Sequence, residues 1–251
     1  MSRFLPPELL DIIADNLHNE PAALKACCTV SKSWISRTRK HLFARIRFDP
    51  SKRSVELWKQ TFPDLSSSLA PYTRTFTFLE LYSTTLVNPD VVSWIHSFDR
   101  IEKLILASIR DSHGVSLVQL HGFSSALRSL SLAYSMVPLP TILGFVSSFP
   151  LLEDLVLVAE NHSNDTCKWI SPSTPPKFTG SLHIDEAVPS ITRWLCSFPG
   201  ALHFRHICLL YEDHTPLITD LVVRGVLKLL KIIYLEAIGA QQWSWRAFIS
   251  G

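Results

Sequence analysis

A short apolar phrase recurs along the chain at a nearly constant spacing. Its clearest copies are Ile101-x-x-Leu104-x-Leu106, Leu127-x-x-Leu130-x-Leu132 and Leu152-x-x-Leu155-x-Leu157. The middle apolar residues of the full series stand at positions 76, 104, 130, 155, 182, 207 and 233, so the intervals are 28, 26, 25, 27, 25 and 26 residues. A period of about 20–29 residues that carries L-x-x-L-x-L is typical of a leucine-rich-repeat solenoid.

Each phrase predicts a short strand, and a helix is predicted to follow it. Alternation at period two places the last two apolar residues of a phrase on one face of a strand. Helical runs, all but the last ending in an aromatic residue, follow at 91–98, 117–123, 142–149, 191–198 and 217–223. Stacked units of this kind bury their apolar faces against one another, with a parallel sheet on one face and helices on the other.

A doubly wound α/β domain is the alternative, because it also alternates strands and helices. The short, regular period and the absence of a Gly-rich phosphate turn from the sequence favour the repeat array. The array is expected to be irregular. No Asn recurs three positions after each strand phrase, and the unit Thr179-x-x-Leu182-x-Ile184 follows two loop-like stretches, 161–165 and 171–176.

Residues 1–48 predict a separate unit of three helices. Leu9, Ile13 and Leu17 recur at helical spacing after Pro6-Pro7, which suits a first helical turn. A second helix is predicted from Ala22 to about Val30, and a third contains Trp34 and Leu42. We place the domain boundary near Asp49-Pro50, with a helical linker over 49–72 and about seven strand units over 73–251.

Composition and charge favour a protein that folds around a large core. Hydrophobic residues make up 47% of the chain, and 24 basic residues nearly balance 22 acidic ones, which gives no whole-chain indication of nucleic acid or an anionic membrane as a partner. The sequence contains no apolar stretch long enough to span a membrane and no signal-peptide pattern at its start. Five scattered cysteines indicate free thiols in a reducing compartment, so a cytoplasmic or nuclear location is expected.

Residues 5–48 resemble an F-box. The match rests on Leu5-Pro6-x-Glu8-Leu9, Ile13, Leu17, Leu24, Cys28, Val30-Ser31-x-x-Trp34 and His41-Leu42-Phe43. An F-box followed by leucine-rich repeats resembles the substrate receptors of Skp–cullin–F-box ubiquitin ligases. The chain as a whole is similar to the fungal members of that class.

The resemblance implies two partners. The F-box would dock on a Skp-type adaptor, and through it on a cullin, while the repeats would hold a protein substrate. The positions that match the adaptor-contacting or supporting residues of the family are Leu5, Pro6, Glu8, Leu9, Ile13, Leu24, Cys28, Val30 and Trp34. A repeat-based interaction scaffold that acts outside ubiquitination is the alternative.

The predicted strand register separates core residues from residues on the open face of the sheet. Leu130 is expected to point inward and Ser131 outward, so an aspartate is expected to be tolerated only at Ser131. The candidates for substrate contact are Lys103, Ile105, Ser129, Ser131, Asp154, Val156, His183, His206 and Tyr234. This mixture of small, apolar and polar side chains favours a protein ligand over a polyanion.

No catalytic, metal or cofactor motif emerges from the sequence. His203-x-x-His206-x-Cys208 lacks a second pair of ligands at a suitable spacing, and no nucleophile elbow is present. We therefore expect a protein that is not an enzyme and binds no cofactor. The basic run over 32–47 predicts a solvated helix face or a surface that complements an acidic adaptor.

Overall fold

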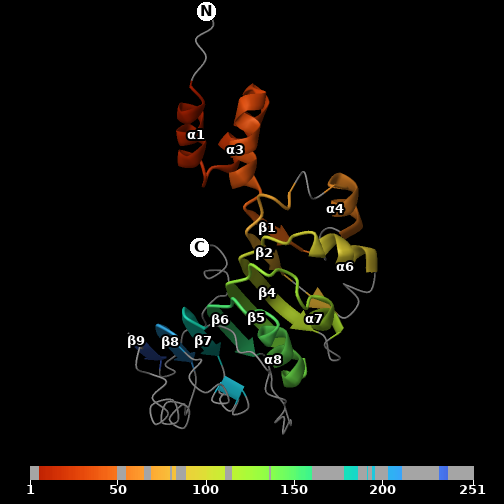
Figure 1. Ribbon diagram of the computed structural model, residues 1–251, viewed down its shortest axis with the longest axis vertical. Coiled ribbons are helices and arrows are strands. Elements are labelled where there is room, and N and C mark those ends of the chain that lie inside the picture. The colour runs from red at the N-terminus through yellow and green to blue at the C-terminus, as the bar shows by residue number, and fades with distance from the viewer. Residues whose placement is uncertain are drawn as a thin grey trace, which may run out of the picture.

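The computed structural model is an α/β protein in which three helices precede a parallel sheet (Figure 1). The described residues are 6–49, 55–64, 69–79, 81–82, 89–110, 115–135, 137–159, 178–185, 191, 194–195, 203–210 and 232–236. Tyr234 is therefore described only as backbone, and the expected helix at 217–223 lies outside the described residues. None of the helices in the described ranges is both long enough and apolar enough to cross a lipid bilayer.

The three predicted N-terminal helices are confirmed. They are α1 (Pro7–Asn16), α2 (Pro21–Val30) and α3 (Lys32–Leu42). A proline occupies the first turn of α1 and of α2, where its missing amide hydrogen removes no helical hydrogen bond. The third helix packs against the other two. The buried apolar residues of this unit, Leu10, Ala14 and Leu24, do not join the core beneath the sheet.

The strands form one parallel sheet whose order follows the chain. Its members are β1 (Arg45–Phe48), β2 (Thr75–Phe78), β4 (Lys103–Arg110), β5 (Ser129–Ser135), β6 (Asp154–Ala159), β7 (Ser181–Asp185), β8 (His206–Leu210) and β9 (Ile232–Glu236), with the short β3 (Leu81–Tyr82) beside β4. Within the described strands the order never reverses, whereas a doubly wound sheet reverses at its switch point.

The predicted register is confirmed along the whole array. The middle apolar residues of the phrases pair in one continuous row: Phe76, Leu104, Leu130, Leu155, Leu182, Ile207 and Ile233. The row from Phe76 to Ile207 is buried, and its residues share one hydrophobic core. The repeat phrase therefore marks equivalent positions in the sheet.

Helices cover one face of this sheet, as Figure 1 shows. They are α4 (Val55–Thr61), α6 (Pro89–His96), α7 (Val115–Gln119) and α8 (Leu139–Ser147). Three of the predicted aromatic ends, Phe98, Phe123 and Phe149, are buried in the layer between helices and strands. The ring of Phe76 lies 5.1 Å from that of Phe98 and 5.9 Å from that of Phe123, measured between centroids. Such edge-to-face contacts add to the stabilisation from burial.

The sheet begins earlier than predicted. Arg45–Phe48 was expected to close the helical unit, but it is strand β1 and pairs in parallel with β2. Ile46 and Phe48 are buried and pair with Phe76 and Phe78. Phe43-x-x-Ile46-x-Phe48 is thus a further copy of the phrase, 30 residues before the next one. It was missed because Arg45 and Arg47 interrupt it and α4 lengthens the interval.

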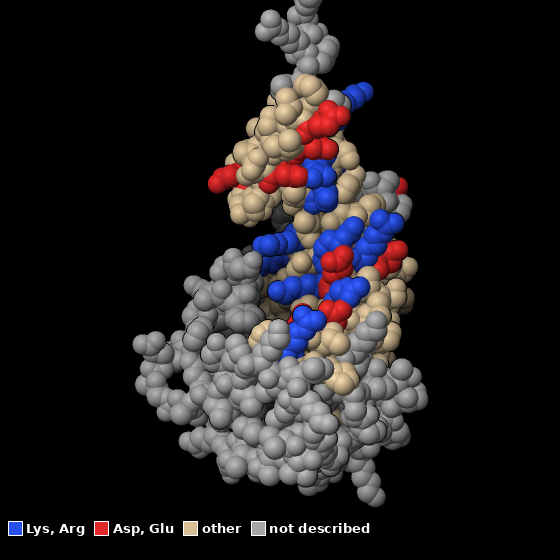
Figure 2. All heavy atoms as spheres, turned by 60° about the vertical axis from the view of Figure 1, so that its left-hand side comes forward, with Lys and Arg blue, Asp and Glu red and all other residues tan. Residues whose placement is uncertain are grey.

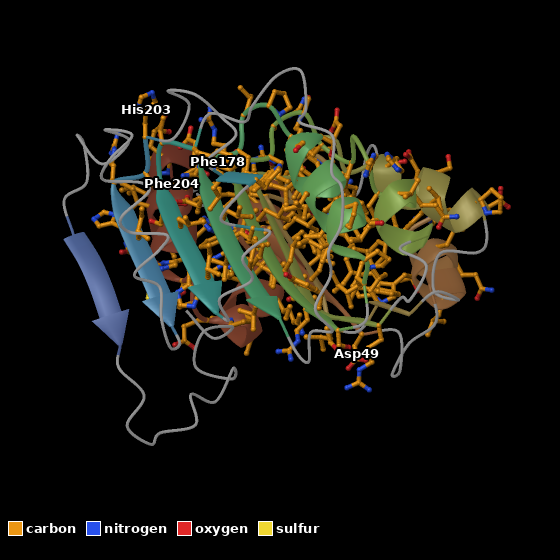
Figure 3. All side chains as sticks on the ribbon, turned by 90° about the horizontal axis from the view of Figure 1, so that it is seen from below. Asp49, Phe178, His203 and Phe204 are labelled. Carbon is orange, nitrogen blue, oxygen red and sulfur yellow. The ribbon has the colours of Figure 1, made fainter. Side chains whose placement is uncertain are left out.

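The unit around β7 also departs from prediction. Thr179 was expected to supply its first core residue, but Thr179 is half-buried and Phe178 is fully buried instead. Phe178 has a φ of 43°, a left-handed value that is uncommon outside glycine. Its ring lies 5.0 Å from that of Phe204, and the two side chains are labelled in Figure 3. The altered backbone directs a larger side chain into the core where the repeat is weakest.

Candidate functional site

Helix α1 carries apolar residues on two faces. Leu10 and Ala14 are buried against the rest of the helical unit. Leu9, Ile12 and Ile13 lie on the other side, with 45%, 55% and 38% of their surfaces exposed. Their spacing of three and four residues places them side by side on the helix. We call Leu9, Ile12 and Ile13 the α1 surface.

Exposed large hydrophobic side chains concentrate in this unit. Val30, the last residue of α2, has 70% of its surface exposed. Among the described residues, only Leu57 and Val118 join Val30 and the α1 surface as exposed large hydrophobics. Scattered single residues of this kind need no explanation, but a row along one helix marks a surface suited to a protein partner.

Polar contacts between α1 and α3 support the back of the α1 surface. The Arg37 guanidinium donates two hydrogen bonds to the Asp15 carboxylate, one of them 2.6 Å long from Nε, and Nε2 of His41 lies 2.7 Å from the same carboxylate. The hydrogen bonds from Arg37 and then from His41 hold the pKa of Asp15 well below its usual range. Because these contacts join residues 15, 37 and 41, they fix α1 on α3.

A second contact joins α2 to α3. The Sγ atom of Cys28 lies 2.9 Å from Oγ1 of Thr38, which is buried and also donates to the carbonyl of Trp34 at 2.6 Å. Cys27 and Cys28 are both thiols rather than members of a disulfide. The hydroxyl of Thr38 is therefore satisfied inside the unit, as a buried polar group requires.

The structure divides the predicted adaptor-binding residues into three groups. Pro6, Glu8, Leu9, Ile13 and Val30 are exposed. Cys28 and Trp34 are half-buried, Leu24 is buried, and Leu5 lies outside the described residues. Leu24 and Cys28 thus belong to the interior of the unit. Sequence reasoning missed Ile12, although its position three residues after Leu9 places it on the same face.

The predicted substrate face is only partly accessible. Lys103 and His206 are exposed, whereas Ile105, Ser129, Asp154, Val156 and His183 are half-buried. Ser131 was expected to be exposed but retains only 8% of its surface. Ala133 and Val158 are also buried, although they do not belong to the core beneath the helices.

Ser131 is therefore not a site where an aspartate would be tolerated freely. The register places it between Ile105 and Val156 on the neighbouring strands, and these longer side chains flank the small serine. On the described outward face, Lys103 and His206 are exposed, whereas Thr77 and Ser131 are buried.

A row of charged residues precedes the strands along one edge of the sheet. Arg74, Glu102, Arg128 and Glu153 are successive members, and from Glu102 onward each backbone amide donates to the carbonyl of the preceding member. Arg74 pairs with Glu102 at 3.4 Å, and Arg128 pairs with Glu153. Opposite charges on neighbouring repeat units thus lie next to each other and attract, at positions whose residue type the apolar phrase does not specify.

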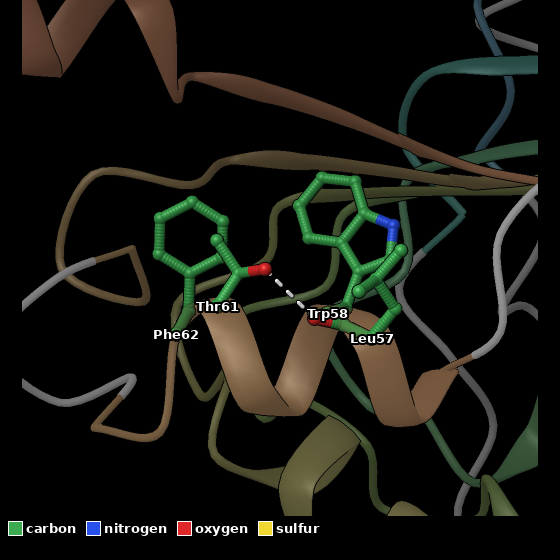
Figure 4. Close-up of a pocket in the computed structure, with 4 residues that line it drawn as sticks. All are labelled: Leu57, Trp58, Thr61 and Phe62. Carbon is green, nitrogen blue, oxygen red and sulfur yellow. Dashed lines mark hydrogen bonds between the residues drawn. The ribbon is translucent and has the colours of Figure 1, made fainter.

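A small cleft on α4 is lined by Leu57, Trp58, Thr61 and Phe62 and encloses about 40 Å³ (Figure 4). Thr61 Oγ1 donates to the Leu57 carbonyl at 2.8 Å within it. Ligand pockets usually span about 300–1,000 Å³, so this cleft is far too small for a metabolite. The described part of the chain also contains no cluster of three or more His, Cys, Asp or Glu side chains arranged to hold a metal ion.

Comparisons with protein-family models, with curated proteins and with solved structures found no match to this chain. The features of the chain that bear on its function are therefore the α1 surface and the outward side chains of the sheet.

Proposed function

We propose that the chain is a non-catalytic substrate-recognition subunit of a cullin-type E3 ubiquitin ligase. In this proposal the helical unit is an F-box that docks on a Skp-type adaptor, and the sheet face binds a protein substrate. The observation that carries the proposal is the α1 surface, because Leu9, Ile12 and Ile13 are left exposed on a helix whose opposite face is already packed. Leu9 and Ile13 also match the F-box pattern.

We further propose that the sheet is an irregular leucine-rich-repeat solenoid. The regular interval of the apolar phrase and the continuous row of paired middle residues support this class. A solenoid presents an extended surface to a partner, and each of its units contacts only its neighbours. Binding, rather than chemistry, is the function for which such an array is suited.

Adaptor binding tests the proposal directly. The full chain and the triple variant Leu9→Ser/Ile12→Ser/Ile13→Ser are each co-expressed with a Skp-type adaptor and purified through a tag on the chain. We expect the wild type to retain the adaptor and the triple variant to lose it. Val118→Ser is the matched control, because Val118 is 57% exposed but lies on α7, outside the helical unit.

The size of the expected loss in adaptor affinity follows from the exposed area of the three side chains. Burying a whole Leu or Ile side chain contributes about 1.5–3 kcal/mol. Since roughly half of each side chain of the α1 surface is exposed, the three together contribute about 3 kcal/mol on docking, or roughly a 100-fold change in affinity. Wild-type protein that fails to bind the adaptor, or a Val118→Ser variant that fails equally with the triple variant, would refute the proposal.

The second candidate is a repeat-based interaction scaffold that acts outside ubiquitination. It shares the sheet face, but its bound partners would not be degraded. Mass spectrometry of partners captured with and without proteasome inhibition separates the two. Partners whose amounts rise on inhibition support the ligase subunit, whereas unchanged amounts favour the scaffold.

A further inference from the structure

The additional strand β1 changes the charge of the open sheet face. Arg45 and Arg47 are exposed, while Ile46 and Phe48 alternate with them and are buried in the core. Both arginines therefore lie on the side of the sheet that turns away from the helices. Lys103 lies two strands further on. Thr75 of β2 pairs with both Arg45 and Lys103, so Lys103 is on the same side of the sheet as Arg45, and it is exposed.

We propose that the outward face of β1, β2 and β4 binds an extended acidic segment of a partner protein, with Arg47 and Lys103 contacting its carboxylates. This inference rests on the proposed function, because it names the class of substrate that the sheet face would take. Figure 2 shows Lys and Arg side chains gathered just below the helical unit, with acidic side chains between some of them.

Acidic side chains on these and neighbouring strands already take part in other contacts. Glu102 pairs with Arg74 at 3.4 Å along the edge of the sheet. Asp154 accepts a hydrogen bond from the backbone amide of Ser181 at 2.6 Å, and Asp49 at the end of β1 is half-buried. Among the described residues, neither Arg47 nor Lys103 has an ion-pair partner. The charges of these two side chains are therefore available to an anionic ligand.

Two observations favour an extended peptide as the occupant. Between the basic residues lie the short side chains of Thr75 and Thr77. Thr75 is half-buried and Thr77 retains only 7% of its surface, so the backbone of a ligand would approach the sheet over Thr75. Strands are spaced about 4.8 Å apart and rise about 3.3 Å per residue, so the Cα atoms of Arg47 and Lys103 lie about 12 Å apart. That distance matches roughly four residues of extended chain, which places two acidic side chains on the same side of the peptide.

Peptide binding to the full chain tests this inference. The probe is a fluorescent peptide of alternating Glu and Ser, and the control peptide has Gln in place of each Glu. We expect the wild type to bind only the Glu peptide, more weakly as salt is raised to about 0.5 M, because screening acts strongly on exposed charges. Arg47→Ser and Lys103→Ser should each weaken binding up to about fivefold, since an exposed ion pair contributes up to about 1 kcal/mol.

Arg205→Ser is the matched control for charge, because Arg205 is exposed immediately before β8, at the far end of the array. It should leave peptide affinity unchanged, and all three variants should melt at the wild-type temperature. Equal binding of the Gln peptide, or an equal loss with Arg205→Ser, would overturn the inference. So would tighter binding of a single-stranded oligothymidylate that depends on Arg47, since that result would assign the surface to nucleic acid.

The adaptor assay keeps this inference separate from the proposed function. Arg47→Ser and Lys103→Ser should retain the adaptor like the wild type, because neither residue belongs to the helical unit. Peptide binding that depends on Arg47 in a chain that never binds the adaptor would remove the ligase function and leave the acidic-ligand surface in place.

Discussion

Two leucine-to-alanine substitutions test both the core and the α1 surface with the same change in chemistry. Leu130 is fully buried at the centre of the sheet, paired with Leu104 on one side and Leu155 on the other. Leu9 has 45% of its surface exposed on α1. Leu130→Ala is expected to lower the free energy of unfolding strongly, and Leu9→Ala is expected to change it little.

The structure sets the size of each effect. The change from Leu to Ala removes three carbon groups, which at about 0.8 kcal/mol each accounts for about 2.4 kcal/mol of lost burial at Leu130. The cavity left in a closely packed core raises the cost to about 3–5 kcal/mol. At Leu9 the expected change is within about 0.5 kcal/mol, because the side chain is half exposed and alanine favours the helix.

Urea denaturation followed by circular dichroism measures both changes. With a slope of about 3 kcal/mol per molar urea, Leu130→Ala should lower the midpoint by about 1 M or more, and Leu9→Ala should leave it in place. Leu9→Ala should still weaken adaptor binding. Equal midpoints for the two variants would refute the register, and a large loss of stability with Leu9→Ala would show that the α1 surface is packed within the chain.

Three further predictions concern single positions. Gly180→Ala should lower the melting temperature, because a Cβ atom there would overlap Oδ1 of Asp154 and displace the carboxylate that accepts a hydrogen bond from the amide of Ser181. Gly144→Ala should raise the melting temperature and add up to about 1 kcal/mol to the free energy of unfolding, because there is open space around the new Cβ and alanine is the better helix former. A lower melting temperature would contradict the open space on α8. Asp15→Asn should cost up to about 1 kcal/mol at neutral pH, since the carboxylate is 43% exposed and its pair with Arg37 is partly screened. The folded pKa of Asp15 is lowered, so its contribution is complete above the ordinary value of 3.8 and is lost as the pH falls below it; the melting temperatures of variant and wild type should converge from about pH 4 downward, and a constant difference would contradict the ion pair.

The strand register was the part of the fold that the sequence predicted most fully. Apolar residues repeat at period two within each strand and at about 26 residues between strands, so both the inward face and the pairing of neighbours follow from spacing alone. Leu104, Leu130 and Leu155 lie where that reasoning placed them. The α1 surface was predicted in part, because Leu9 and Ile13 fit the F-box pattern.

Features that depend on three-dimensional neighbours were missed. The burial of Ser131 follows from its position in the middle of a packed sheet rather than from its own polarity. Phe178 enters the core through a left-handed backbone angle that residue type does not indicate. Strand β1 was hidden because its outward residues, Arg45 and Arg47, suggested an exposed basic helix. Arg47, one of these two residues, is exposed together with Lys103 on the face to which we assign an acidic ligand.

The connection between the helical unit and the sheet bears on how a receptor of this kind would work. Helix α3 ends at Leu42 and β1 begins at Arg45, so only two residues separate them. One of these, Phe43, packs against the core of the sheet, and its ring lies 6.1 Å from that of Phe62. Under the proposed function, this short and packed connection would hold the substrate close to the adaptor in a restricted orientation. Since the basic outward face begins on β1, an acidic substrate segment would bind directly beside the helical unit rather than at the distant end of the array.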